Sequence, residues 1–460
     1  MKRKLLAACM AVCMLVGSIG LSAGAQENVA ESDEAVSVYK ESGQTVSTDG
    51  LDTIQKLTIH SDGAGGVSTY GETLNTTEWQ LLIQTNKQRF ANNLWPLSIS
   101  EKMLLAASTR AEELTDYYDH TRPDGRDCFT VLDECDISYS SAGENIAAGQ
   151  TSPENVLNSW MNSAGHRENI LSENFVHLGT GYAYGGIYGH NWVQLFTGGC
   201  SPEITDVVTD EDGAGFYYVG TSIDQMSLIL ETYCDDQGYS YIPVATEMCD
   251  SFDVRKTGIQ ELVVGYNGQA VGVDIVMHPF KDVGNGWYTE CVINCYLNGY
   301  MTGLNSSTFG ISQPLSRSQF ASILHRMNGS PEAAYTNKFK DVKNGEWYTE
   351  PVIWASSTGV VNGYENGNFG PADNITREQM AVMMHNYAKY KGYDTSAIAD
   401  INEYSDAGQV SSYATEAMKW AVGSGIISGK EGGARLDPLG NASRAECAAI
   451  IMRFVQLYEE

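Results

Sequence analysis

One pattern of apolar and polar residues repeats three times over residues 280–460. Each copy holds an aromatic residue, a glycine 12 positions later, and an arginine 30, 30 or 31 positions after the aromatic residue. The aromatic residues are Trp287, Trp347 and Tyr413, and the arginines are Arg317, Arg377 and Arg444. Such regular spacing is typical of a repeat protein, in which no single unit buries its own apolar face.

The apolar spacing predicts two helices in each repeat, joined by a loop that contains glycine. In the second copy the first helix carries Val352, Ile353 and Ala355 and ends at Gly359. The second helix opens in every copy with Ser or Thr, followed three residues later by Gln or Glu. This pattern is a capping box and predicts a helix start.

The arginine inside each capping box is not explained by the helix itself. A cation in the first turn opposes the helix dipole, so an isolated helix would favour Asp or Glu there. A guanidinium beside free backbone N–H groups predicts an anion site. The alternative is an ion pair with a neighbouring carboxylate of this acidic chain.

The three motifs Ser-Arg-Ser-Gln, Thr-Arg-Glu-Gln and Ser-Arg-Ala-Glu resemble the S-layer homology (SLH) module. The resemblance implies an all-α bundle with pseudo-threefold symmetry, made of repeats 279–337, 338–396 and 397–460. It also implies binding to anionic secondary cell-wall polysaccharide through the three arginines and the three leading aromatic residues. The first copy has Asn294 where the others have Trp354 and Trp420, so one groove is expected to bind less well.

The N-terminus has the pattern of a secretory signal peptide over residues 1–25, with three cations, an apolar run and a small-x-small cleavage site. Cleavage changes the formal charge from −29 to −32, because residues 1–25 carry three cations and no acid. Such a charge disfavours nucleic acid and anionic lipid. No later segment predicts a membrane span. We therefore expect an extracellular protein on the wall or S-layer of a Gram-positive-type bacterium.

Residues 26–75 are acidic and rich in Gly, Ser and Thr, which predicts a flexible leader. Residues 76–202, the front domain, begin with helical patterns over 77–90, 100–118 and after Pro153. Strand patterns follow at 179–184 and 191–196. This order predicts an α+β layered domain in a multidomain chain.

Residues 203–278 are rich in β-branched and aromatic residues, with strand patterns at 216–219, 239–244, 261–266 and 271–276. Asn267-Gly268 predicts a tight hairpin turn between the last two strands. The segment resembles a small bacterial Ig-like β module. Its expected role is a spacer between the front domain and the wall.

Three motifs of the front domain hold the candidate site residues His120, Glu144 and His166. The motifs are Asp-His-Thr-Arg-Pro, Gly-Glu-Asn-Ile-Ala and Ser-Ala-Gly-His-Arg-Glu-Asn-Ile. No HExxH pair fixes two ligands on one helix, so each histidine taken alone is better explained by a structural role than by metal binding. Gly143 and Asn145 are expected to shape a turn that points Glu144 inward.

In this order and spacing the motifs resemble the CAP superfamily of SCP-like extracellular domains. The resemblance covers about residues 77–200 and implies an α-β-α sandwich with a cleft that holds a divalent cation. His120, Glu144 and His166 would be the ligands, with zinc the expected ion. Eukaryotic relatives carry a second Glu where this chain has Ser163, so we expect a weak, partly open centre.

Two functions follow for the front domain. The first is a binding or interaction domain with an unknown ligand, which is favoured because the second Glu and a recognised nucleophile are missing. The second is a metal-dependent hydrolase acting on peptide or wall polymer, with His120, Glu144 and His166 around a metal-bound water. His177 and His190 are expected at the surface or in support of the site.

The cysteines leave their pairing open. Ten occur in the chain, and eight remain after removal of Cys9 and Cys13. A bond between Cys234 and Cys249 across a hairpin is plausible. Cys128 and Cys135 are too far apart to bond if both lie on one helix.

Overall fold

The computed structural model describes residues 76–209, 215–235, 237–284, 286–430 and 432–459, together with four short strands before residue 75. These strands are β1 (Val36–Val38), β2 (His60–Ser61), β3 (Val67–Ser68) and β4 (Thr73–Leu74). The predicted signal peptide and most of the predicted leader lie outside the described residues. Within the leader, β1 is paired antiparallel with β6. No described helix is long and apolar enough to cross a bilayer.

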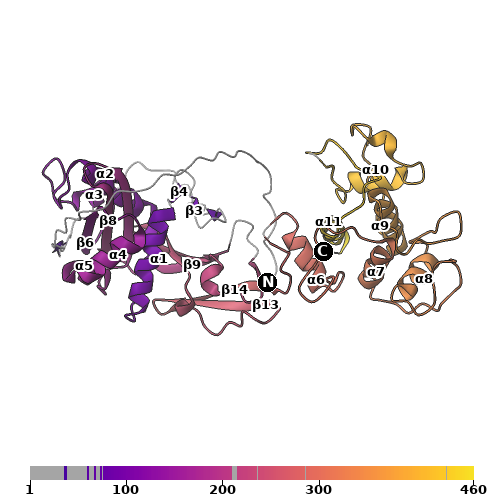
Figure 1. The fold of residues 1–460 in the computed structure, drawn as a ribbon, viewed down its shortest axis with the longest axis horizontal. Helices are drawn as coiled ribbons and strands as arrows, with labels where there is room; N and C mark the ends of the chain where they lie inside the picture. Colours follow the sequence, from indigo (N-terminus) through magenta and orange to yellow (C-terminus); the bar gives the residue numbers. More distant parts are fainter. Residues whose placement is uncertain are drawn as a thin grey trace.

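The front domain is a sheet between two layers of helices, at the left of Figure 1. The sheet has the strand order β1-β6-β8-β7, with β6 at Ser141–Ala148, β7 at His177–Gly185 and β8 at Gly189–Gly198. One layer holds α1 (Thr76–Phe90), α4 (Pro153–Asn162) and α5 (Ala164–Ile170). The other holds α2 (Glu101–Asp116) and α3 (Thr130–Glu134).

Strand alternation sends neighbouring residues of the sheet into two different cores. Trp192 and Phe196 of β8 pack with α1 and α4, whereas Val193 and Leu195 pack with α2 and α3. The predicted front-domain helices and late strands are confirmed. The expected turn around Glu144 is wrong, because residues 141–148 form a fully buried strand.

Residues 203–278 form two small sheets. The strands are β9 (Glu203–Val208), β10 (Phe216–Tyr218), β11 (Ile229–Cys234), β12 (Gly238–Pro243), β13 (Gly258–Tyr266) and β14 (Gln269–His278). Two short 3-10 helices, η1 (Ile223–Gln225) and η2 (Thr246–Met248), connect them. The predicted Asn-Gly hairpin is confirmed, since Tyr266 pairs with Gln269 and Asn267 and Gly268 both have positive φ.

This β segment is attached to the front domain along one side. Strand β5 (Ile99–Ser100) of the front domain pairs with β12, so the sheet β5-β12-β11-β9 contains residues from both parts. The Trp95 ring packs edge-on against Tyr266, with centroids 5.9 Å apart. The segment therefore does not stand clear of the front domain, as a free spacer would.

The last part of the chain holds three helix pairs, at the right of Figure 1. They are α6 (Thr289–Leu297) with α7 (Arg317–Met327), α8 (Thr349–Ser357) with α9 (Arg377–Lys391), and α10 (Thr415–Gly423) with α11 (Arg444–Tyr458), preceded in the third repeat by η3 (Ala407–Gln409). The capping boxes are confirmed at α7, α9 and α11. Helices of different repeats pack together, α7 on α8, α9 on α10 and α11 on α6. One apolar core therefore runs through all three repeats.

Candidate functional site

Glu144 is held by two partners in the interior of the front domain. It lies on β6, has no exposed surface, and points to the α2 face of the sheet. Arg110 of α2, also fully buried, donates from Nε to Oε1 of Glu144 at 2.8 Å. Nδ1 of His120 lies 2.6 Å from the other oxygen, Oε2. Two of the predicted site residues, His120 and Glu144, are thus brought together.

The charge of Arg110 is further compensated. Its Nη1 contacts Glu113 at 2.6 Å, and its Nη2 donates to the carbonyl of Asp119 at 3.0 Å. Arg122 pairs with Glu113 at 2.6 Å and with Glu134 at 2.9 Å. A buried ion pair is tolerated only when its remaining hydrogen-bonding groups are satisfied, which this network achieves.

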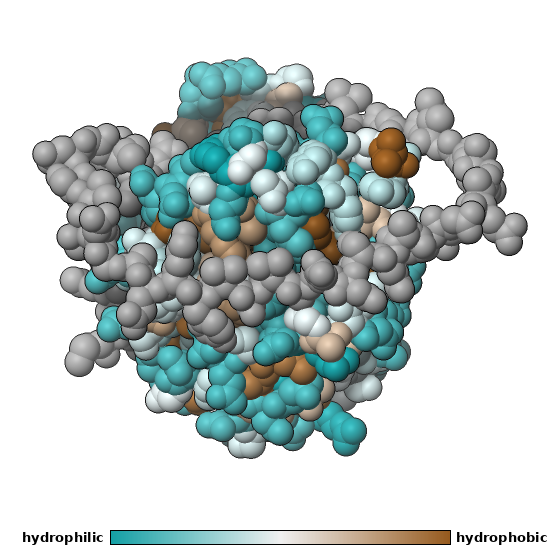
Figure 2. Space-filling view, turned by 90° about the vertical axis from the view of Figure 1, so that its left-hand side faces the viewer, coloured by the Kyte–Doolittle hydropathy of each residue, from teal (hydrophilic) through white to brown (hydrophobic). Residues whose placement is uncertain are grey.

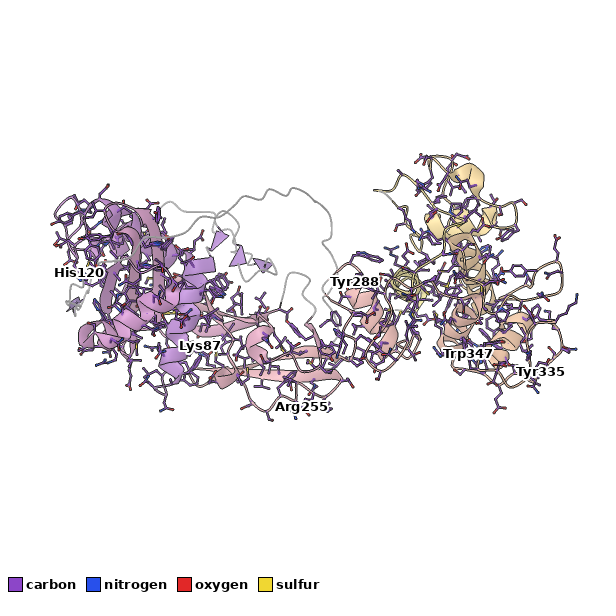
Figure 3. All side chains as sticks on the ribbon, in the orientation of Figure 1. Lys87, His120, Arg255, Tyr288, Tyr335 and Trp347 are labelled. Atoms are coloured by element: carbon purple, nitrogen blue, oxygen red, sulfur yellow. A yellow bond between two sulfur atoms is a disulfide. The ribbon has the colours of Figure 1, made fainter. Side chains whose placement is uncertain are left out.

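The pairing with Glu144 fixes the orientation of the His120 ring. Their 2.6 Å contact places Nδ1 of His120 against the carboxylate and turns Nε2 away from it. The His120 side chain is 20% exposed, and Figure 3 shows it at the outer end of the domain. The pair therefore has the arrangement of a histidine oriented by a carboxylate.

His166 is not placed with this pair. Its helix, α5, packs on the opposite face of β6, where Asn145 donates to the carbonyl of His166 at 3.1 Å. Asn169 of α5 bonds Asn145 in turn, at 2.9 Å. Among the described residues, no group at metal-ligand spacing combines His120, Glu144 and His166.

The arrangement around Glu144 does not fit the zinc ion that the motif resemblance implies. Both carboxylate oxygens are engaged, one of them by the guanidinium of Arg110. A buried cation that already neutralises the carboxylate weakens its attraction for a divalent ion. The only group at ligand spacing in the described part of the chain is His177 with Cys200 and Cys234.

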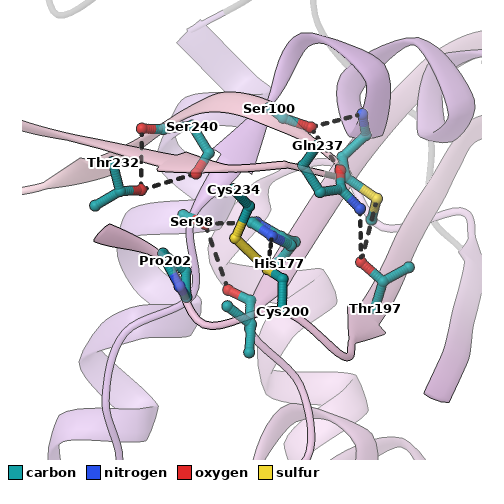
Figure 4. Close-up of a disulfide and its surroundings, with 12 residues drawn as sticks. Ser98, Ser100, His177, Thr197, Cys200, Pro202, Thr232, Cys234, Gln237 and Ser240 are labelled. Carbon is teal, nitrogen blue, oxygen red and sulfur yellow. Dashed lines mark hydrogen bonds between the residues drawn. A yellow bond between two sulfur atoms is a disulfide. The ribbon is translucent and has the colours of Figure 1, made fainter. Parts of the chain in front are cut away.

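That group is a disulfide with a histidine beside it (Figure 4). Cys200 and Cys234 are bonded to each other, so their sulfurs are not available as thiolates. Nε2 of His177 lies 3.0 Å from Cys200 Sγ, and its Nδ1 lies 2.7 Å from Ser98 Oγ. Burial lowers the pKa of His177 to about 4.

Two sequence expectations are corrected here. Of the two positions expected for His177, the surface is wrong, because the residue is buried. Cys234 bonds Cys200, and Cys249 is a free thiol, so the pairing of Cys234 with Cys249 is wrong. Cys200 lies just after β8 and Cys234 ends β11, and their contact depends on how the two sheets meet. Sequence spacing does not contain that information.

The three arginines of the capping boxes lie between repeats. Each is 4–5% exposed, and its Nε and Nη2 donate to two backbone carbonyls of another repeat. The acceptors are Phe369 and Asn362 for Arg317, Leu436 and Ser428 for Arg377, and Phe309 and Thr302 for Arg444. The sequence weighed an anion site against an ion pair, and neither alternative included these carbonyls. The bonds supply a structural reason for a cation at this position.

A repeated aspartate holds each acceptor loop. Asp282 accepts from the N–H groups of Phe309 and Gly310, and Asp341 and Asp406 make the equivalent bonds in their own repeats. One peptide unit in each loop thus lies between an aspartate of its own repeat and an arginine of another. This aspartate recurs five, six and seven residues before the leading aromatic residue of the three repeats, and that recurrence was the signal for its role.

The leading aromatic residues remain at the surface. Trp287, Trp347 and Tyr413 are 66%, 60% and 58% exposed. The first two pack edge-on against the tyrosine that follows them, with centroids 5.6 Å and 5.3 Å apart. The hydroxyl of Tyr413 donates to the buried Glu378 at 2.7 Å.

Comparison with known families agrees with this division of the chain. Residues 82–196 match the cysteine-rich secretory protein family, CAP, and residues 279–321, 338–381 and 403–448 match the S-layer homology domain. The chain carries one CAP domain and three SLH domains. The SLH domains, with surface-layer and cell-surface proteins among the relatives, identify it as an extracellular protein associated with the cell wall.

The relatives named here each cover less than half of this chain. The uncharacterized protein YkwD of Bacillus subtilis is 38% identical over 148 residues, 32% of this chain and 54% of YkwD. An endoglucanase of a Bacillus strain is 32% identical over 174 residues, 38% of this chain and 18% of the enzyme. The chain thus spans about half or less of the length of these two relatives. An SCP-domain protein of Bacillus anthracis is 30% identical, covers 27% of this chain and 40% of its own, and aligns with a TM-score of 0.25.

Proposed function

We propose that the protein displays its CAP domain on the cell wall, where the SLH domains hold it by binding anionic secondary cell-wall polysaccharide. The observation that carries this proposal is the exposure of Trp287, Trp347 and Tyr413 at equivalent positions of the three repeats. Large aromatic side chains left in solvent at a repeated position are better explained by a ligand than by the core. Their flat faces suit the C–H groups of sugar rings.

The buried arginines contribute to this proposal through the shape of the grooves. Their guanidinium groups hold one repeat against another, and each side chain is nearly inaccessible. The closed series of contacts, from first to second, second to third and third to first repeat, supports a pseudo-threefold bundle. In this arrangement the aromatic residues would contact the polymer, and the arginines would position the surfaces that carry them.

Retention on purified wall sacculi tests the anchor. The triple variant Trp287→Ala, Trp347→Ala, Tyr413→Ala is expected to be released while it stays folded, with a modest loss of thermal stability because Tyr413 no longer bonds the buried Glu378. Ile398→Ala is the matched control, because Ile398 is 66% exposed in the third repeat and outside the aromatic positions. Full retention of the triple variant would contradict the proposed contacts.

For the CAP domain we propose a binding or interaction function that does not depend on a metal. The engagement of Glu144 by Arg110 and His120 supports this over a metal-dependent hydrolase. One observation favours a second candidate, a metal-independent hydrolase, namely the histidine–carboxylate pair of His120 and Glu144. Incubation of peptidoglycan and of peptides with the protein and with His120→Ala separates the two, because only a hydrolase gives products that disappear in the variant.

A further inference from the structure

The three leading aromatic residues occupy equivalent positions, but their surroundings differ. Each precedes the first helix of its repeat, and that helix packs on the second helix of a neighbouring repeat, α8 on α7, α10 on α9 and α6 on α11. In the first turn of this second helix, the residue after the arginine is Ser318 in α7, Glu378 in α9 and Ala445 in α11. All three are buried. Their backbone N–H groups donate to loops of the next repeat, at Pro371, Pro438 and Ile311. The three places therefore differ in side chain and not in backbone.

Glu378 ties the aromatic residue of the third repeat to the second repeat. One of its oxygens, Oε1, accepts from the hydroxyl of Tyr413 at 2.7 Å and from the hydroxyl of Ser411 at 2.8 Å. The other oxygen, Oε2, accepts from the backbone N–H of Ser411 at 2.9 Å. The segment that carries Tyr413 is thus held by a carboxylate of the chain itself.

The equivalent positions of the other repeats cannot make these bonds. The counterparts of Tyr413 with Glu378 are Trp347 with Ser318 and Trp287 with Ala445. Ser318 donates its hydroxyl to the carbonyl of Pro371 at 2.6 Å, and Ala445 has no polar side-chain atom. An acid at this place is therefore confined to the second capping box, Thr-Arg-Glu-Gln.

The segment that leads to Tyr413 is also the most acidic of the three. Residues 338–347 carry three lysines against Asp341 and Glu346, and residues 279–287 carry one lysine and one aspartate. Residues 397–413 carry three acids and neither Lys nor Arg. An anionic polymer is repelled by the last of these segments and not by the first.

The lysines of the second repeat are available to such a polymer. Lys338, Lys340 and Lys343 are all exposed. The ammonium groups of Lys338 and Lys340 donate to the backbone carbonyls of Ser356 and Asn366, at 3.3 Å and 2.7 Å. A backbone carbonyl carries no net charge, so these contacts leave both positive charges uncompensated.

We propose that the anionic polymer is held mainly at the surfaces around Trp287 and Trp347, because Glu378 weakens its binding at Tyr413. This inference rests on the proposed wall anchor and names the residue that makes its three surfaces unequal. The carboxylate of Glu378 repels a second anion. It also occupies the donors of Ser411 and Tyr413, which could otherwise bond an acidic group of the polymer.

The sequence pointed to a different weak surface, that of the first repeat, because of Asn294. Its equivalents, Trp354 and Trp420, are 4% and 0% exposed. The difference at Asn294 therefore concerns the packing between helices, whereas Glu378 contacts the exposed aromatic residue itself.

Sedimentation of the full chain with purified wall sacculi tests the inference. Trp287→Ala and Trp347→Ala are each expected to weaken binding about tenfold, and Tyr413→Ala by less than about threefold. Glu378→Ser, which gives the second capping box the residue of the first, should tighten binding about two- to fivefold, the scale of one charge interaction at a hydrated surface. In that background Tyr413→Ala should weaken binding more than it does in the wild type, because the two residues are coupled.

Glu332→Ser is the matched control, because Glu332 is an exposed acid between the first two repeats and its removal changes the net charge equally. Thermal unfolding checks that each variant is folded. The end of the CAP domain that faces the viewer in Figure 2 is mainly hydrophilic, with hydrophobic residues in small separate areas, so apolar adsorption of this end should not mask the differences.

Two results would overturn the inference. One is a Tyr413→Ala variant that loses as much binding as the tryptophan variants, and the other is a Glu378→Ser variant that binds no more tightly than Glu332→Ser. Failure of the wall anchor itself gives a different result, in which none of the three aromatic variants weakens binding.

Discussion

Arg444 donates a 2.8 Å hydrogen bond from Nε to the carbonyl oxygen of Phe309, a residue 135 positions earlier in the chain. The same bond joins Arg317 to Phe369 and Arg377 to Leu436. Because the third repeat returns to the first, no repeat is left at an end. Solenoid repeats need capping units at their ends, and a closed series does not.

Substitution of the closing arginine should destabilise all three repeats together. Arg444→Ala leaves two buried carbonyls without a donor and is expected to lower the free energy of unfolding by about 2–4 kcal/mol. Arg444→Lys keeps the charge but cannot reproduce the planar pair of donors, so we expect most of the loss to remain. Denaturant unfolding of the full chain measures both. If Arg444→Lys has the same free energy of unfolding as the wild type, the charge of residue 444, and not its pair of hydrogen bonds, stabilises the repeats.

Asp282 and Asp406 should make the SLH region sensitive to acid. Burial acts to raise the pKa of Asp282, but the N–H groups of Phe309 and Gly310 outweigh it, so the net pKa is lowered. A carboxyl whose folded pKa is depressed stabilises the fold above its unfolded pKa of about 4, and this stability is lost as the pH falls through the folded value. Asp282→Asn should therefore lower the melting temperature at pH 7 and weaken its dependence on pH below 4. An unchanged acid profile would exclude Asp282 as its source.

Glu144 and His120 should contribute unequally to the stability of the CAP domain. Glu144→Gln leaves Arg110 with only part of its compensation and is expected to destabilise the CAP domain by about 3–5 kcal/mol, as breaking a buried ion pair does. His120→Ala removes a partly exposed ring and should shift stability by about 1 kcal/mol. Thermal unfolding of the two variants compares them directly. Equal losses would show that His120 belongs to the structural network.

Reduction of the disulfide should loosen the junction of the CAP domain and the β segment. A bond that closes a loop of 34 residues is expected to contribute about 4 kcal/mol. Cys200→Ser should lower the melting temperature as much as a reducing agent does on the wild type. Cys249→Ser is the control, because Cys249 is a free thiol and should leave the response to reductant intact.

Local sequence signals predicted local structure well. The capping boxes, the Asn-Gly hairpin and most helices follow from contacts within a few residues, which the order of residue types records. The acceptors of Arg317 are different, because they lie 45 and 52 residues away in another repeat. The spacing of residues within one motif does not reveal such distant partners. The arginine was therefore interpreted as a ligand site, although it also has a structural role.

The candidate site shows the same limit. His120 and Glu144 come together as the motif order indicated, but Arg110 was missed, although it stands among Ala107, Ala111 and Leu114 on the apolar face of its helix. A cation on a buried helix face requires a partner, and that was the available signal. The position of His166 depends on strand alternation, since α5 packs where Asn145 points and Glu144 does not.

Strand β14 ends at His278, and Phe280 already belongs to the core of the repeats, which Phe216 and Val276 of the β segment also contact. At the other end of the same hairpin Tyr266 rests on Trp95. Contacts at both ends of one hairpin restrict rotation of the CAP domain about the chain axis. The anchor would therefore fix the orientation of the CAP domain relative to the wall as well as its location. A ligand of the domain would then always approach from the same direction.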